Sequence, residues 1–391
     1  MGERVFDRIE VIDVDAHISE PADLWTTRVS KKWGDLVPHV IKDPGGGPDD
    51  VWAIGDSVLG PTAGAAMAGF DGMMPEHPAT LADAHPAASD AKARLRYLDE
   101  EAIYGQIQYP NFGGFGSGRF LQLNEPDLML ECVRAYNDFL FDWCSADPKR
   151  LIPVTATPFW DVKASVAEIE RCAKLGSKGV LFGSQPQDFG QPHIADQYWD
   201  PVWAAAQAAD LSINFHIGSG RMDAVYGGWE GYEFRTGLAK QCVIFFLQNA
   251  SCIGDVIFGG VCHRFPDLQF VSVESGIGWL MFALEGFDWQ WQNNGVTTEH
   301  PEYDLLPSEY FRRQIHGCFW FEEQSARTGI ELYPDNLLFE TDFPHPTSMA
   351  VGPRSIAEHP AEYVERAWSD ISEETLQKVL HDNAVRLYNL D

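Results

Sequence analysis

Residues 9–17 of the 391-residue chain read IEVIDVDAH, an apolar run that ends in an acid and a histidine. Its β-branched residues and regular alternation predict a buried strand. Because side chains alternate between the two faces of a strand, we expect Asp13, Asp15 and His17 on one face. Carboxylates and an imidazole are costly to bury unless a cation or hydrogen bonds compensate them. The stretch therefore predicts a strand whose end carries two metal ligands, Asp15 and His17.

The composition limits the possible partners of the chain. Hydrophobic residues make up 45% of it and aromatic residues 13%, which is enough for one large core and argues against disorder. The formal charge of −30 repels phosphate backbones and anionic lipid headgroups. No apolar segment approaches the roughly 18 residues of a membrane span. We therefore expect no nucleic acid and no membrane as partners.

The seven cysteines indicate the compartment. They are scattered, odd in number and form no C-x-x-C pair, which is typical of reduced thiols in a cytoplasm rather than of a disulfide scaffold. We expect a cytoplasmic protein that acts on a small-molecule substrate as a homo- or hetero-oligomer.

Strand and helix patterns alternate along the rest of the chain, and with residues 9–17 they give eight strands. A closed (β/α)8 barrel forming a single domain over residues 1–391 is the predicted fold. A doubly wound open sheet is the alternative, but no G-x-G-x-x-G motif follows any strand. A final helix at 373–390 is expected to pack outside the barrel. The seven further strands are predicted at 104–109, 151–157, 179–182, 212–216, 269–274, 314–321 and 336–341.

Residues 37–88 interrupt this alternation directly after the first strand. Runs at 37–41 and 51–54 flank a Gly-Gly-Gly-Pro turn and predict a β-hairpin, and residues 61–88 have no strong period. Such a long connection predicts a lid over the barrel mouth. Aromatic residues around it suggest an apolar face toward the substrate, with ordinary core packing as the alternative; they are Trp25, Trp52, Phe70, Phe112, Phe115, Trp229 and Tyr232.

Ionisable residues recur where the predicted strands end. His216 ends the fifth strand, Glu274 ends the sixth, and Asp342 and His345 follow the eighth. Each alone could be a core histidine, a helix cap or a turn residue. Active sites of such barrels lie at the carboxyl ends of the strands, so together with Asp15 and His17 these residues predict a metal site. Nitrogen and oxygen ligands without thiolate suit zinc, manganese or non-heme iron.

Two further acids, Glu101 and Glu340, are weaker candidates, because acids in such positions are more often structural or support a ligand.

The order of these residues resembles the amidohydrolase superfamily, in particular its branch of aminocarboxymuconate-semialdehyde and resorcylate decarboxylases. The resemblance rests on Asp15-x-His17, on His216 and on Asp342. It also rests on three phrases, which are Ser19-Glu20-Pro21 followed by Leu24-Trp25, the run YWDPVW at 198–203, and TDFPH at 341–345. It covers nearly the whole chain and implies a metal-dependent barrel enzyme.

Two positions depart from the pattern of that family. Many members begin with H-x-H, whereas this chain has Asp15 at the first position. The decarboxylases usually end the sixth strand in a catalytic histidine, whereas this chain has Glu274. The second departure puts a simple transfer of the decarboxylase mechanism in doubt.

Three hypotheses of function follow. The six candidate ligands Asp15, His17, His216, Glu274, Asp342 and His345 suffice for two metals, and the superfamily has a small offshoot of dinuclear hydroxylases. The first hypothesis is therefore a monooxygenase with two irons, or iron and manganese, that hydroxylates an unactivated carbon. The second is a decarboxylase or hydrolase with one zinc or manganese, in which Glu274 acts as general base and His345 assists catalysis. The third is an inactive metal-binding partner subunit.

Overall fold

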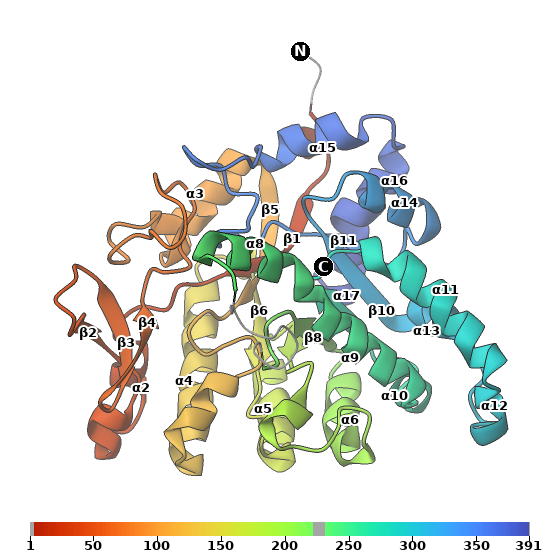
Figure 1. The fold of residues 1–391 in the computed structure, drawn as a ribbon, viewed down its shortest axis with the longest axis horizontal. Coiled ribbons are helices and arrows are strands. Elements are labelled where there is room, and N and C mark those ends of the chain that lie inside the picture. The colour runs from red at the N-terminus through yellow and green to blue at the C-terminus, as the bar shows by residue number, and fades with distance from the viewer. Residues whose placement is uncertain (1–3, 222–230, 391) are drawn as a thin grey trace.

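Strand β1 (Val11–His17) is buried along its whole length and begins an eight-stranded parallel sheet. The computed structural model describes residues 4–221 and 231–390. The strand order is β1-β5-β6-β7-β8-β9-β10-β11, and a parallel bridge joins Ala16 to Phe343 beyond the last strand. The sheet therefore curls into a nearly closed barrel (Figure 1), which confirms the (β/α)8 prediction.

The strand positions agree with the sequence patterns to within a few residues. They are β5 (Ile103–Tyr109), β6 (Leu151–Ala156), β7 (Gly179–Leu181), β8 (Ser212–His216), β9 (Phe270–Val273), β10 (Ile315–Phe319) and β11 (Leu337–Phe339).

Helices follow the strands around the outside of the barrel (Figure 1). Capping side chains fix several of their ends: Asp90 accepts a hydrogen bond from the Ala93 amide, and Asp161 accepts from the amides of Lys163 and Ala164. The longer helices are α3 (Ala91–Glu101), α4 (Pro126–Cys144), α5 (Val162–Leu175), α6 (Asp200–Ala208), α8 (Phe234–Ile244), α9 (Phe246–Phe258), α11 (Gly278–Asn293), α13 (Pro307–Gln314), α14 (Gln324–Leu332) and α15 (Pro360–Trp368).

Helix α11 has no counterpart among the predicted elements. Its sequence is apolar on more than one face, so no single stripe marks it as a surface helix. Leu284 and Trp291 are buried, whereas Phe282 and Trp289 are 85% and 70% exposed.

The C-terminal segment does not lie outside the barrel as expected. Residues 373–390 form α16 (Glu373–Gln377), a π-helical turn (Lys378–Asp382) and α17 (Asn383–Tyr388). Leu387 and Tyr388 pack in one cluster with Ile12 and Val14 of β1, and the Tyr388 hydroxyl donates to Asn214 Oδ1 at 2.7 Å. The last helix thus fills part of the barrel interior.

The insertion after β1 contains three strands rather than a two-stranded hairpin. They are β2 (His39–Lys42), β3 (Asp50–Ile54) and β4 (Ser57–Pro61), and they form a separate antiparallel sheet. This sheet lies to one side of the barrel in Figure 1. The prediction of one domain over the whole chain stays a prediction.

Within the described residues, one helical stretch, Phe234–Phe258, is long and apolar enough to cross a membrane by length and composition alone. The expectation that no apolar segment approaches that length is therefore wrong. Helices in the core of globular proteins also pass this test, although only 33% of the apolar 18-residue window in this stretch is buried. The predicted absence of a membrane partner stays a prediction.

Candidate metal centre

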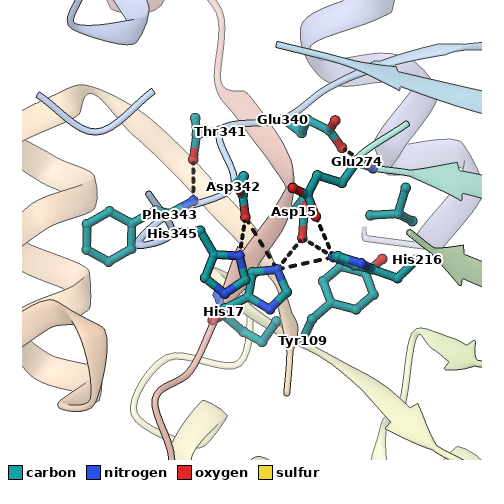
Figure 2. Close-up of polar contacts among 12 residues, drawn as sticks. Asp15, His17, Tyr109, His216, Glu274, Glu340, Thr341, Asp342, Phe343 and His345 are labelled. Atoms are coloured by element: carbon teal, nitrogen blue, oxygen red, sulfur yellow. Dashed lines mark hydrogen bonds and ion pairs between the residues drawn. The ribbon is translucent and has the colours of Figure 1, made fainter. Parts of the chain in front are cut away.

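Six ionisable side chains meet at the carboxyl ends of the barrel strands (Figure 2). Asp15 and His17 come from the end of β1, His216 ends β8, Glu274 directly follows β9, and Asp342 and His345 follow β11. Their ligand atoms form two overlapping groups within which all atoms lie inside 4.8 Å of one another. The structure thus brings together the six residues that the sequence analysis selected: Asp15, His17, His216, Glu274, Asp342 and His345.

The two histidines at the centre point their Nε2 atoms at each other. His17 Nδ1 donates to the Pro110 carbonyl and His216 Nδ1 donates to the Ile217 carbonyl, both at 2.9 Å. With Nδ1 protonated, each neutral ring presents a lone pair at Nε2, and the two Nε2 atoms are 3.1 Å apart. Burial lowers the pKa of His216, but the Asp15 carboxylate outweighs it and raises that pKa, so a metal would displace a proton from this ring. Two nitrogens that bind one metal at about 2.1 Å are separated by roughly 3.0 to 3.4 Å. The pair is therefore set up to share a cation.

Asp15 lies beside both imidazoles and has no other partner. Its Oδ1 is 3.3 Å from His17 Nε2 and 3.5 Å from His216 Nε2, and neither carboxylate oxygen accepts a hydrogen bond. Burial alone would raise the pKa of Asp15, but the neighbouring His216 and His17 outweigh it and hold that pKa below its usual range. A fully buried carboxylate without hydrogen bonds is costly unless a cation compensates it.

Asp342 and His345 form the second side of the site. Asp342 Oδ1 lies 2.7 Å from His345 Nδ1 and 3.5 Å from His17 Nε2. Neither contact has the geometry of a hydrogen bond, so Oδ1 accepts none. Its Oδ2 accepts a hydrogen bond from the Thr347 hydroxyl at 2.6 Å. The His345 ring stacks on that of His17 with centroids 3.8 Å apart, and its buried Nε2 has no partner. Burial lowers the pKa of His345 to about 3 and that of His17 to about 4, so both rings are neutral.

Glu274 differs from the other five in its surroundings. Its Oε2 is 3.6 Å from His216 Nε2, and its backbone amide donates to Glu340 Oε2 at 3.1 Å. Burial, and next the Asp342 carboxylate, raise the pKa of Glu274 well above its usual value. Burial and the Asp15 charge do the same to the pKa of Asp342. Burial and the neighbouring charges therefore favour the protonated form of both acids in the metal-free protein.

Two site residues have a left-handed backbone. Glu274 has a φ of 53° and Asp342 a φ of 58°. Glutamate rarely adopts this region of backbone conformation, whereas aspartate adopts it more often. Such strain persists only where the surrounding structure enforces it, and it is frequent at functional sites. The Glu274 carboxylate is thus held at the mouth of the barrel at an energetic cost, which is smaller for Asp342 because aspartate tolerates this region.

A buried network that the sequence analysis did not identify supports β1 beneath the site. Asp13 accepts hydrogen bonds from Gln106 Nε2 at 2.7 Å and from the Thr341 amide at 2.8 Å. Arg94 donates to Gln106 and Gln108 and, through Nη2, to the His17 carbonyl at 2.6 Å. Arg94 lies in α3, whose sequence pattern is that of an amphipathic helix, so Arg94 would be expected on its exposed face. Only the tertiary contacts show its role.

Asp13 itself does not join the donor set, contrary to the expected shared face. The β1–β5 register shifts between Asp13 and Ala16, which breaks the simple alternation. Glu101 pairs with His359 at 2.9 Å and also lies outside the set. Glu340 is buried behind Glu274 and supports its backbone rather than contributing to either donor group.

The aromatic residues near the insertion divide into two kinds. Trp25, Trp52 and Phe112 pack against one another in the core, whereas Phe115 covers the imidazoles of His17 and His216 at 5.0 and 4.1 Å between centroids. Phe70 lines a pocket beside the site and Tyr232 is 48% exposed. Trp229 lies outside the described residues.

The insertion reaches the mouth of the barrel. The amides of Met67 and Ala68 donate to the Pro344 carbonyl at 2.8 and 3.2 Å, directly beside the donor set. That the insertion closes as a lid stays a prediction.

The donor set fits a divalent metal. Four buried polar atoms in it, both oxygens of Asp15, Oδ1 of Asp342 and Nε2 of His345, have no hydrogen-bond partner. Such atoms are normally satisfied, and a cation bound through one oxygen of Asp15 and through Oδ1 of Asp342 would satisfy two of the four. Imidazole and carboxylate donors suit zinc, manganese or iron.

Comparisons with known proteins agree with this geometry. The sequence matches the amidohydrolase family over residues 12–390. It is 25% identical over 316 residues to a gamma-resorcylate decarboxylase of Polaromonas sp. strain JS666, covering 76% of this chain and 87% of that protein. It is 23% identical over 279 residues to a 2-amino-3-carboxymuconate-6-semialdehyde decarboxylase of Dictyostelium discoideum, covering 68% and 69% of the two chains.

Solved structures show the same fold. An amidohydrolase from Mycobacterium avium subsp. paratuberculosis superposes with a TM-score of 0.75 at 23% identity, covering 97% of this chain and 99% of that one. A dihydroxybenzoic acid decarboxylase from Polaromonas sp. JS666, solved with manganese and the inhibitor 2-nitroresorcinol, superposes with a TM-score of 0.64 at 19% identity, covering 98% and 97%.

Proposed function

We propose that this chain, which belongs to the amidohydrolase family, is a metal-dependent decarboxylase of small organic acids. The observation that carries the proposal is the pair of lone-pair nitrogens of His17 and His216, 3.1 Å apart, next to the unpartnered Asp15 carboxylate. The two curated relatives are decarboxylases, which favours the second hypothesis from the sequence over the monooxygenase.

The metal would be held by Asp15, His17 and His216 of one donor group and by Asp342, which belongs with His17 to the other group. Bound there, a divalent cation supplies a Lewis acid that anchors and polarises the substrate carboxylate. The imidazoles are fixed in the tautomer required for this by the carbonyls of Pro110 and Ile217. Phe115 covers the same rings and limits the access of water.

Glu274 would deliver the proton. Decarboxylation breaks the bond between the substrate carbon and its carboxylate; the electron pair stays on the carbon and carbon dioxide leaves, so a proton must take its place. Glu274 keeps a proton because burial raises its pKa, and it is 8% exposed whereas Asp15, His17 and His216 are fully buried. A buried acid that is neutral near pH 7 is suited to proton donation.

The test is release of carbon dioxide by the manganese-loaded protein from a panel of hydroxybenzoic acids under nitrogen. In D2O the product should carry one deuterium at the carbon that lost the carboxylate. Glu274→Gln should keep the metal and lose turnover, whereas Glu340→Gln, a buried acid behind it, should keep both. If Glu274→Gln loses the metal instead, Glu274 is a ligand and not the acid.

A second candidate function is the dinuclear iron, or iron and manganese, monooxygenase. The observation that favours it is the overlap of the two donor groups, Asp15, His17, His216, Glu274 and His17, Glu274, Asp342, His345, which share His17 and Glu274. A carboxylate at the shared position can bridge two cations. Two metals per chain and oxygen-dependent turnover would favour this reading, while one metal and turnover under nitrogen would exclude it.

A further inference from the structure

A pocket of about 430 Å³ opens beside the donor set, and its wall is largely apolar. Four segments build it. The insertion contributes Met67 and Phe70, helix α8 contributes Leu238 and Val243, the residues after β10 contribute Trp320 and Phe321, and residues 345–355 after β11 form the remaining wall. Aromatic and thioether side chains of this kind adapt to flat apolar ligands. The apolar part of the wall is therefore suited to an apolar ligand body.

The pocket meets the donor set on its accessible side. His345 and Thr347 both line the pocket, and the Thr347 hydroxyl donates to the Asp342 carboxylate. Among the six donors, only Glu274 and His345 have any exposure, 8% each, whereas the other four are fully buried. A ligand in the pocket would thus approach the donor set from the side of His345.

The pocket has no free cation for a second acidic group. Arg235 and Arg354 are the only lysine or arginine side chains among the described lining residues. Arg235 pairs with Glu76 and Arg354 pairs with Asp71, each at 3.3 Å, and both acids belong to the insertion. Both arginines therefore already have an acidic partner, although the pairs are exposed and weak, and a second carboxylate would have to compete with Glu76 or Asp71 for them.

Size separates this pocket from a site for one ring. A cavity of about 150 Å³ holds a single benzene ring, so 430 Å³ has room for roughly two to three fused rings. The Polaromonas relative, in contrast, was solved with the one-ring inhibitor 2-nitroresorcinol.

We propose that the substrate is a monocarboxylic acid with a bulky apolar body of more than one ring, whose carboxylate meets the donor set while its body fills this pocket. This inference rests on the proposed function for the placement of the carboxylate. The apolar wall then determines specificity, and Val243 and Phe321, which are 59% and 56% exposed, become covered when the ligand binds.

The experiment measures binding to the manganese-loaded protein by titration calorimetry with three acids that share one head group. They are 2-hydroxybenzoate with one ring, 3-hydroxy-2-naphthoate with two, and 4-hydroxyisophthalate with one ring and a second carboxylate. Burial of the added ring should tighten binding of the naphthoate by at least about tenfold over the hydroxybenzoate. The second carboxylate should give no gain. Equal affinities of the one-ring and two-ring acids, or tighter binding of the diacid, would overturn the proposal.

Two matched variants locate the effect. Val243→Asp places a charge in the pocket wall at an exposed position, where folding is tolerant, and should remove most of the gain of the naphthoate. Val58→Asp changes a valine that is 45% exposed on β4, outside the pocket lining, and should leave the gain intact. An unchanged gain in Val243→Asp would place the ring elsewhere and contradict the proposal.

Failure of the proposed function gives a different result. The two-ring acid could bind tenfold tighter, and Val243→Asp could remove this gain, while no acid releases carbon dioxide. In that case the pocket assignment stands and the decarboxylase proposal fails.

Discussion

Replacing Asp342 with asparagine should separate metal binding from folding. The Asp342 side chain is fully buried near Asp15, and burial followed by the Asp15 charge raises its pKa. Because the folded protein favours the protonated form of an acid that the unfolded chain ionises, Asp342 costs stability at neutral pH, and asparagine removes this cost. Asparagine also tolerates the left-handed backbone, φ 58°, that residue 342 adopts. The metal-free variant should therefore be at least as stable as the metal-free wild type.

The metal response should nevertheless be lost. A ligand present at 100 times its Kd stabilises the folded state by about 2.7 kcal/mol. A chain of 391 residues has an unfolding entropy of about 0.8 kcal/mol/K, so this stabilisation raises Tm by about 3 °C. If loss of the carboxylate weakens metal binding by at least about 100-fold, the same metal concentration gives no more than about 0.4 kcal/mol, a shift below about 1 °C.

Differential scanning calorimetry with and without Mn²⁺ measures both quantities. Glu340→Gln is the matched control, because Glu340 is an equally buried acid that lies outside both donor groups, and it should keep the shift of about 3 °C. An Asp342→Asn protein that retains the full shift would show that Asp342 is not a ligand. A metal-free variant that melts more than about 5 °C below wild type would show that Asp342 is chiefly structural.

Three further predictions concern protons, the supporting network and the aromatic cover. The raised pKa values of Glu274 and Asp342 and the lowered pKa values of His17 and His345 mean that the acids carry protons in the metal-free protein, while these two rings do not. Metal binding should therefore release at least one proton and become tighter as the pH rises from 6 to 8. Calorimetry in buffers of different ionisation enthalpy measures the proton release, and the absence of any release would contradict this prediction. Arg94→Lys should lower the free energy of unfolding, measured in urea melts, by about 2 to 4 kcal/mol. An ammonium group cannot replace the four hydrogen bonds of the buried guanidinium. A loss below about 1 kcal/mol would mean that the network is dispensable. Phe115→Ala should keep the metal but lower kcat at least about tenfold by admitting water over His17 and His216, and unchanged steady-state kinetics would exclude the covering role.

The candidate site could be predicted because its residues are tied to strand ends. In a parallel barrel the carboxyl ends of all strands meet at one mouth, so short local patterns sufficed to group His216, Glu274 and Asp342 with Asp15 and His17. The predicted strands were also close to those observed, because each strand is a short apolar run between helices and is therefore visible in the local sequence. Their convergence did not require any long-range contact to be known.

Features that depend on tertiary contacts could not be predicted. The C-terminal helix looks amphipathic, and nothing local shows that Tyr388 reaches Asn214 inside the barrel. The register shift after Asp13 removes that side chain from the donor set, although strict alternation would place it there. Arg94 looks like a surface residue of α3 until its four buried acceptors are seen.

The decarboxylases usually have a histidine where this chain has Glu274, and this difference can now be interpreted physically. From the sequence it favoured a bridging ligand and two metals, because a carboxylate binds hard cations on both oxygens. In the structure the same side chain lies 3.6 Å from His216, and burial and Asp342 raise its pKa. A neutral acid at that position can donate the proton that a protonated histidine would otherwise supply, so the exchange is compatible with decarboxylation at one metal. The two readings differ in one property of the loaded protein: Glu274 keeps its proton beside one metal and loses it between two.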